Sequence, residues 1–180
     1  MHNGVMDDLV RQAMRKWPSV PAAFGWLGLD ARGRWFLRDD NVQSAGPFPH
    51  CKGDLLVHDK LLSFIGRNYA ADDQGRWYFQ NGPQRVYVEL ESTPWVWRVQ
   101  PDGTLHTHTG DIVQAQQCLS DAEGRVYFSS AVGIGLVHTS DMLSVADAIE
   151  RGDWKPNFVD ARQLPEQFGF VRSPLATATT

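Results

Sequence analysis

Residues Arg76–Val99, RWYFQNGPQRVYVELESTPWVWRV, decide the fold. Apolar and polar residues alternate on both sides of an Asn-Gly-Pro turn, which is the pattern of half-buried strands joined as a β-hairpin. Pro83 has no amide hydrogen with which to close a two-residue Asn-Gly loop. We therefore expect a four-residue loop over residues 81–84, and a third strand over residues 94–100.

This register makes both faces of the hairpin chemically consistent. It pairs Phe79 with Val86 on the apolar face and Tyr78 with Tyr87 on the other. We expect the apolar face to pack against a helix at residues 58–69. The core side chains predicted on the two sides of this contact are Trp77, Phe79, Val86, Val88 and Leu90 from the hairpin and Leu61, Leu62 and Ile65 from the helix.

Periodicity and turn residues predict the other elements. Helices are expected at 7–17, 58–69 and 140–151, hairpins at 24–38 and 112–129, and strands at 131–138 and at 94–100, the latter paired with Leu105 and His106. Residues 41–53 are predicted to be loop, and the chain from residue 153 onward to be an extended wrap with a loose tail at 172–180. The predicted fold class is α+β, with antiparallel β-hairpins and about three helices packed on the sheet.

Three segments share one pattern. DARGRWFL from Asp30, DDQGRWYF from Asp72 and DAEGRVYF from Asp121 each place Gly three residues and Arg four residues after an Asp. Their unequal separation disfavours a propeller or solenoid and favours a duplicated strand-turn-strand motif. We expect an N-terminal unit at 1–92 and a C-terminal unit at 93–180, or one compact domain. Whether the sheet forms one layer or two stays open.

Composition excludes several classes of protein. A net charge of -4 disfavours general nucleic-acid binding, which needs a basic face. No apolar run approaches the roughly 20 residues that span a bilayer, so we expect no membrane association. Cys51 and Cys118 belong to no CxxC pair, which favours a reducing, cytoplasmic location. Acidic pairs such as Asp39-Asp40 and Asp72-Asp73 are predicted to be solvated surface.

Four segments carry a resemblance to known proteins. MDDLVRQAMRKWP, GWLGLDARGRW, LLSFIGRNY and YFQNGPQRVYVELESTPW resemble a family of small proteobacterial proteins known only as a domain of unknown function. The resemblance is strong over residues 6–97 and weak beyond them. The order of hairpin, helix and hairpin also resembles another uncharacterised bacterial family of repeated β-hairpin and helix units, for which a signalling role has been suggested. Both resemblances imply an α+β fold with duplicated motifs, and neither implies an activity or catalytic residues.

The outer face of the central sheet is the predicted binding surface. Tyr and Arg are over-represented among residues that dominate binding energy. The five candidates are Arg76, Tyr78, Arg85, Tyr87 and Arg98. The surplus of arginines favours a protein or small ligand that carries acidic groups. The sequence therefore predicts a non-catalytic binding or regulatory module without a cofactor, of undetermined oligomeric state. In the alternative, this face seats Trp154, Phe158 and Phe168 of the C-terminal wrap.

A small metal-dependent enzyme is the alternative function. His106 and His108 are spaced to share one face of a strand, and Cys118 or His138 are possible further ligands. Two neighbouring histidines are only half of a metal site, so we expect no tightly held transition metal. Gly133-Ile134-Gly135 lacks the third glycine of a dinucleotide fingerprint, and we interpret it as a strand bend or a close approach of backbone.

Overall fold

The computed structural model describes residues 7–178, which form two compact units. The N-terminal unit contains residues 7–30, Arg34–Glu91 and 171–178, and the C-terminal unit contains Ala31–Gly33 and Ser92–Phe170. Each unit has its own sheet and its own helices. The mixture of helices and strands confirms the α+β class.

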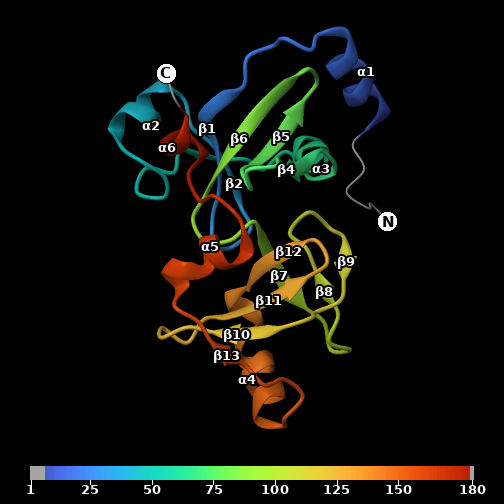
Figure 1. The fold of residues 1–180 in the computed structure, drawn as a ribbon, viewed down its shortest axis with the longest axis vertical. Helices are drawn as coiled ribbons and strands as arrows, with labels where there is room; N and C mark the ends of the chain where they lie inside the picture. The colour runs from blue at the N-terminus through green and yellow to red at the C-terminus, as the bar shows by residue number, and fades with distance from the viewer. Residues whose placement is uncertain (1–6, 179–180) are drawn as a thin grey trace. The chain divides into compact units, whose positions relative to one another are not determined.

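The N-terminal unit is built on a six-stranded sheet (Figure 1). The strands across this sheet are β3 (Asp54–Leu55), β2 (Trp35–Leu37), β1 (Ala23–Leu29), β6 (Gln84–Leu90), β5 (Trp77–Asn81) and β4 (Tyr69–Ala71). The central pair of β1 and β6 is parallel, and the other neighbours are antiparallel. The predicted antiparallel hairpins are present, but the parallel pair was not expected. The long segment between β1 and β6 supplies the crossover that a parallel pair needs.

The central hairpin has the predicted register. Phe79 lies opposite Val86 and Tyr78 lies opposite Tyr87. Pairing ends at Asn81 and Gln84, and Gly82 takes a φ of 57° at the tip. A positive φ suits a residue without a side chain, so Gly82 permits a two-residue loop of Gly82 and Pro83, shorter than the four-residue loop expected over residues 81–84.

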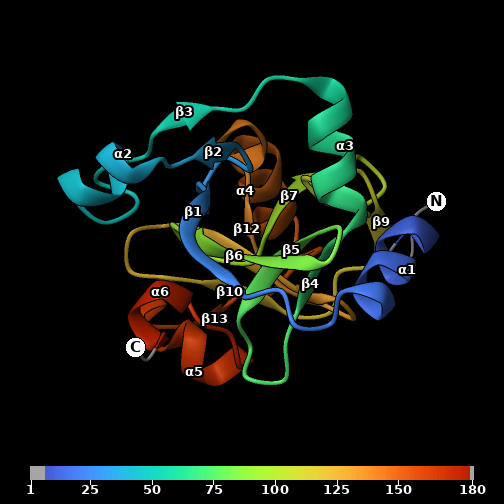
Figure 2. The same ribbon diagram turned by 90° about the horizontal axis from the view of Figure 1, so that it is seen from above.

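Four helices belong to the N-terminal unit, and two of them, α2 (Asp40–Ala45) and α6 (Pro174–Thr177), were not predicted. The other two are α1 (Asp8–Lys16) and α3 (Asp59–Arg67). Figure 2 shows α3 lying along one face of the sheet, where the ring of Phe64 meets that of Phe79 edge-on at 5.4 Å. The loop prediction for 41–53 missed α2, because its start is set by a cap rather than by apolar periodicity. The Asp39 carboxylate caps it by accepting a hydrogen bond from the Val42 amide.

Strand β1 contains a bulge opposite the middle of β6. Its register is set by two pairs, Ala23 with Val86 and Leu27 with Val88. Residues 24–26 therefore stand opposite the single residue Tyr87, and Gly25 takes a φ of 85°. In a regular strand Phe24 and Trp26 would point to the same face. The extra residues separate them, because bulges turn side chains to new directions.

A buried arginine holds the bulge in place. The guanidinium of Arg38, which is 1% exposed, donates hydrogen bonds to the carbonyls of Gly25, Gly46 and Cys51 at 2.7 to 3.0 Å. The Arg38 amide also donates to the Trp26 carbonyl at 2.8 Å. The bulge is thus fixed by a fully buried side chain.

The C-terminal segment is anchored to β6 rather than loose. The buried carboxylate of Glu89 accepts hydrogen bonds from the Ser173 hydroxyl at 2.6 Å and the Leu175 amide at 3.1 Å. The Leu90 amide donates to the Arg172 carbonyl at 2.8 Å. The predicted loose tail at 172–180 is therefore wrong for its described part, because a buried carboxylate on β6 binds the start of α6.

The C-terminal unit is built on a seven-stranded sheet. Its strands, in order, are β13 (Asn157–Phe158), β10 (Cys118–Ser120), β11 (Val126–Ser130), β12 (Gly133–Val137), β7 (Trp95–Val99), β8 (Leu105–His106) and β9 (Ile112–Val113). Strand β7 is thus not a third strand of the central hairpin, because its main-chain partners are β12 and β8. The predicted pairing of residues 98 and 99 with 106 and 105 is confirmed. Helices α4 (Met142–Glu150) and α5 (Leu164–Phe168) bring the total to six in residues 7–178, against about three expected.

Gly135 on β12 makes room for a buried tryptophan. A Cβ atom at this position would overlap the indole of Trp97, which is fully buried and donates a 2.9 Å hydrogen bond to the Phe128 carbonyl. The interpretation of the glycine pair as a close approach is confirmed for Gly135.

The two sheets are connected in the same order. In each, a hairpin precedes a three-stranded meander whose last strand pairs in parallel with the first strand of the hairpin. The strands outside this shared arrangement differ: β3 extends the first sheet, whereas β9 and β13 extend the second. The predicted duplication of a hairpin motif differs from the structure in these details and in its parallel pairs.

Candidate functional site

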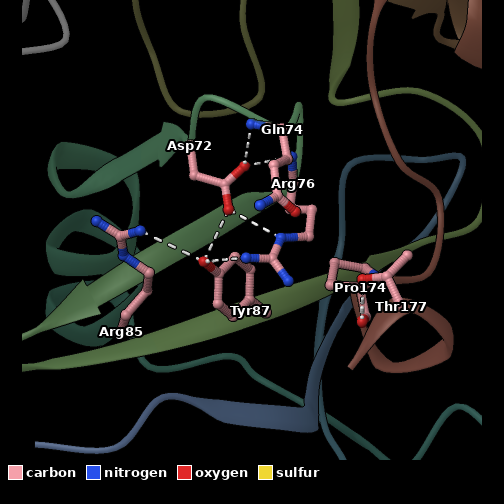
Figure 3. A network of polar contacts seen from close by, with 7 residues as sticks. All are labelled: Asp72, Gln74, Arg76, Arg85, Tyr87, Pro174 and Thr177. Atoms are coloured by element: carbon pink, nitrogen blue, oxygen red, sulfur yellow. Dashed lines mark hydrogen bonds and ion pairs between the residues drawn. The ribbon is translucent and has the colours of Figure 1, made fainter. Parts of the chain in front are cut away.

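The candidate site begins at the turn between β4 and β5. One oxygen of the Asp72 carboxylate accepts hydrogen bonds from the amides of Gln74 and Arg76, both at 2.9 Å (Figure 3). The other oxygen accepts a 2.8 Å hydrogen bond from the Arg76 Nε atom. The same Asp-to-Arg contacts recur at the other two turns of this pattern, Asp30 with Arg34 and Asp121 with Arg125. The shared sequence pattern therefore fixes an arginine beside each turn.

Tyr87 connects this turn to a second arginine. Its hydroxyl donates a hydrogen bond to Asp72 at 2.8 Å and accepts from Arg76 at 3.2 Å and from Arg85 at 3.3 Å (Figure 3). Tyr87 and Arg85 lie two residues apart on β6, so their side chains share one face of the sheet. We call Asp72, Arg76, Arg85 and Tyr87 the arginine cluster.

Aromatic rings pack against the residues of the arginine cluster. The bulge in β1 brings Phe24 into a parallel stack on Tyr87, with 4.7 Å between the ring centres. The Arg76 guanidinium lies 4.7 Å from the centre of the Tyr87 ring, and that of Arg85 lies 3.9 Å from the centre of the Tyr78 ring. Such cation–π contacts hold both guanidinium groups in defined positions.

The two tyrosines are buried, contrary to the prediction of an exposed face. Tyr78 is 6% and Tyr87 3% exposed, while Arg76 and Arg85 remain half-buried above them. Phe24 and the two guanidinium groups supply this cover. In the C-terminal unit, Trp154 packs on Phe128 with ring centres 4.9 Å apart and Phe158 is 72% exposed. Trp154 and Phe158 therefore do not support the alternative in which the C-terminal wrap covers this face of the sheet.

Hydrogen bonds set the charge state of the cluster. Burial of Asp72 acts to raise the pKa of its carboxyl group, but the hydrogen bonds from Arg76, Tyr87 and Gln74 outweigh burial and lower that pKa below its usual value. Burial raises the pKa of Tyr78 above its usual value. At neutral pH the Asp72 carboxylate is thus ionised and Tyr78 is neutral.

The arginine cluster has one more positive than negative charge. Asp72 forms an ion pair with Arg76 at 2.8 Å. Arg85 forms no ion pair with any residue in 7–178, and the only hydrogen bond of its side chain within that range goes to Tyr87. A guanidinium carries five N–H donors in a planar fork that suits carboxylate and phosphate oxygens. The arrangement can therefore bind an anion without losing its internal hydrogen bonds.

Arg98 is not part of this cluster. It lies on β7 in the C-terminal unit, where its guanidinium donates hydrogen bonds to Asp141 at 2.8 and 3.3 Å. Of the five predicted site residues, the fold brings Arg76, Tyr78, Arg85 and Tyr87 together. Arg98 belongs to the other sheet, because β7 pairs with β12 and β8.

The two histidines do not lie on one strand. Strand β8 ends at His106, and His108 lies in the following turn, where its ring is 5.5 Å from that of Trp95 and its Nδ1 atom accepts a hydrogen bond from the Val96 amide. Within residues 7–178, no three His, Cys, Asp or Glu side chains converge to hold a metal ion. The alternative of a metal-dependent enzyme thus gains no donor set from the described structure.

Sequence reasoning missed Asp72 and Phe24. Asp72 was assigned to solvated surface, yet its side chain is 6% exposed. The signal was present, since the recurrence of Asp with Gly and Arg at fixed offsets is typical of a turn closed by the Asp side chain. Phe24 had no such signal, because its position depends on the bulge.

Comparisons with known proteins found similarity to proteins that carry only family designations. Two solved structures are similar to it: a DUF1285 family protein from Silicibacter pomeroyi, at 15% identity and a TM-score of 0.49 over 79% of this chain and 85% of that chain, and a DUF1285 family protein from Shewanella baltica, at 16% identity and a TM-score of 0.47 over 72% of this chain and 97% of that chain. A comparison with curated proteins finds no match. Helices long and apolar enough to cross a membrane are absent from residues 7–178.

A family model covers nearly the whole sequence. It matches residues 6–175, and its description is "Protein of unknown function (DUF2946)". The prediction of an uncharacterised family is thereby confirmed: the chain belongs to the family of proteins of unknown function that this model describes.

Proposed function

We propose that the protein is a non-catalytic binding module that holds a carboxylate or phosphate group of its partner at the arginine cluster. One observation carries the proposal: Arg85 is held in place by Tyr87 and Tyr78 yet forms no ion pair within residues 7–178. An arginine held in this way loses little freedom on binding, so more of its interaction energy is available for affinity.

The local charge agrees with this function. Asp72 neutralises Arg76, and its lowered pKa keeps it ionised at neutral pH, so the remaining positive charge is that of Arg85. An incoming anion replaces water at a half-buried guanidinium, where charge-assisted hydrogen bonds are stronger than in bulk solvent. The cluster contains no nucleophile with an adjacent base, which favours binding over catalysis.

Titration with small anions tests the proposal. Inorganic phosphate and succinate are added separately to the full chain, and the Nε–H signals of the arginines are followed by NMR. We expect saturable shifts of the Arg85 and Arg76 signals with at least one of the two anions. We expect none for Arg125, which occupies the matching turn of the C-terminal unit beside Asp121 and Tyr127.

A pair of variants separates binding from folding. Arg85→Gln should leave the free energy of unfolding within about 1 kcal/mol of the original, because the side chain is half-buried and forms no ion pair in the described residues. It should abolish the anion-dependent shift of Arg76, whereas Arg125→Gln should preserve it. Equal titration of the Arg85→Gln protein and the original protein would refute the proposed function.

A further inference from the structure

A cavity lies on the opposite face of the six-stranded sheet from the arginine cluster. On β5 and β6, Phe79 and Val86 alternate with the residues of the cluster and therefore point to the other face. There they border a cavity of about 520 Å³ beneath α3. The other apolar residues that line it are Ala23, Trp26 and Leu27 of β1, Leu37 of β2, Leu56, and Leu61 and Ile65 of α3.

The bulge in β1 shapes this cavity. Phe24 is stacked on Tyr87, on the side of the cluster, whereas Trp26 lines the cavity together with Ala23 and Leu27. A regular strand would have put Trp26 on the same side as Phe24. The buried side chain of Arg38 fixes the bulge through the carbonyl of Gly25, so the direction of Trp26 is set by the core.

The cavity leaves large apolar side chains in contact with water. Trp26 is 37%, Leu37 45% and Leu61 39% exposed, and Val86 is half-buried although its strand is central in the sheet. Without the cavity, this face of the sheet would be closed core. Apolar surface that stays open in a concave site is typical of ligand-binding pockets, whose volumes run from roughly 300 to 1,000 Å³.

The residues that line the cavity also determine which charge a bound molecule can carry. Among the described residues the lining contains no charged side chain, and its polar members are the side-chain amides of Asn81 and Gln84 at the end of the β5–β6 hairpin. Gln84 is held by a 3.2 Å hydrogen bond from its Nε2 atom to the Pro21 carbonyl. A charged group would lose its hydration without gaining an opposite charge, so this lining disfavours ions.

We infer that this cavity binds a neutral small molecule with an apolar body and one hydrogen-bonding end, of the class of fatty alcohols and acyl esters. The volume admits on the order of 15 non-hydrogen atoms, at the roughly 30 Å³ that one water occupies in the liquid. The apolar body contacts Trp26, Leu61 and Phe79, and the polar end reaches the Asn81 and Gln84 amides. The inference does not depend on the arginine cluster.

Fluorescence of a neutral probe tests the inference on the full chain. N-phenyl-1-naphthylamine, which becomes fluorescent in apolar surroundings, is titrated with the protein, and 1-decanol and decanoate are compared as competitors. We expect saturable binding at one site per chain, with displacement by 1-decanol at a lower concentration than by decanoate. Failure of the original protein to bind the probe overturns the inference, and so does better displacement by decanoate.

Variants locate the probe. Ala23→Leu fills the cavity, and Leu61→Gln adds a polar group at a partly exposed position; each should weaken probe binding at least tenfold. Leu143→Gln is the matched control, because Leu143 lies on α4 of the other unit and is 84% exposed.

Melting curves establish which variants are folded. Of the two cavity variants, Leu61→Gln is the milder change. Unchanged binding by a folded Leu61→Gln protein overturns the inference. A second outcome also overturns the inference: the original protein binds no probe, and sedimentation shows that Leu61→Gln converts a dimer into a monomer. A second copy of the chain is then the occupant.

Discussion

The Tyr87 hydroxyl donates a 2.8 Å hydrogen bond to the Asp72 carboxylate, which joins strand β6 to the turn between β4 and β5. Tyr127 and Asp121 form the same bond, also at 2.8 Å, in the C-terminal unit. The second pair has a single arginine beside it, Arg125 on the Asp121 carboxylate, whereas both Arg76 and Arg85 donate to the Tyr87 hydroxyl. The two pairs therefore allow stability and binding to be tested separately.

Replacing Tyr87 by Phe removes this bond while keeping the ring. We expect Tyr87→Phe to lower the free energy of unfolding by about 1.5 to 3 kcal/mol, the range for hydrogen bonds to charged groups. It should also weaken the anion-dependent shift of Arg85, because the hydroxyl that positions the guanidinium is gone. Tyr127→Phe should give a similar loss of stability in urea unfolding and leave the anion titration unchanged.

The lowered pKa of Asp72 predicts a specific dependence of stability on pH. The folded pKa lies below the unfolded value of about 3.9, so the contribution to stability is present above that value and is lost as pH falls through the folded pKa. Asp72→Asn should therefore cost the most stability at neutral pH and progressively less below about pH 4. Urea unfolding of both proteins at several pH values measures the difference, and a difference that grows on acidification would contradict the assignment.

Glu89 should behave in the opposite way. Burial raises its pKa above the usual value and outweighs the hydrogen bonds from Ser173 and Leu175. The folded state then binds more protons than the unfolded state between the two pKa values, so this contribution to stability falls as pH rises through that window. Ser173→Ala removes a hydrogen bond that favours the ionised carboxylate. It should cost more stability at neutral pH than below the usual pKa of Glu, as measured by urea unfolding at both.

Gly135→Ala should disturb the core of the C-terminal unit. The added methyl group overlaps the Trp97 indole, and overpacking of this kind costs about 1 to 3 kcal/mol. In a double-mutant cycle with Trp97→Phe, the smaller ring should recover part of that loss. Strictly additive effects on the urea midpoint would show that the two residues do not compete for the same space.

Local pattern alone predicted the central hairpin and three of the six α-helices in residues 7–178, namely α1, α3 and α4. Alternation around the Asn-Gly-Pro turn set the register of Phe79 with Val86, and the periodicity of α3 and α4 set their positions, because these features depend on neighbours close in sequence. The same holds for the pairing of Val99 with Leu105 across a short loop.

Contacts between distant residues decided the rest. The parallel pairing of β1 with β6 and of β7 with β12 assigns β7, and with it Arg98, to a second sheet, and no local periodicity contains that choice. The bulge in β1 then moves Phe24 to the arginine cluster and Trp26 to the cavity, since it depends on Arg38 and on the register with Tyr87. The sequence by itself determined which side chains share a face of each hairpin, whereas only the tertiary structure determined which faces are buried and what lies opposite them, because burial depends on segments far apart in the chain.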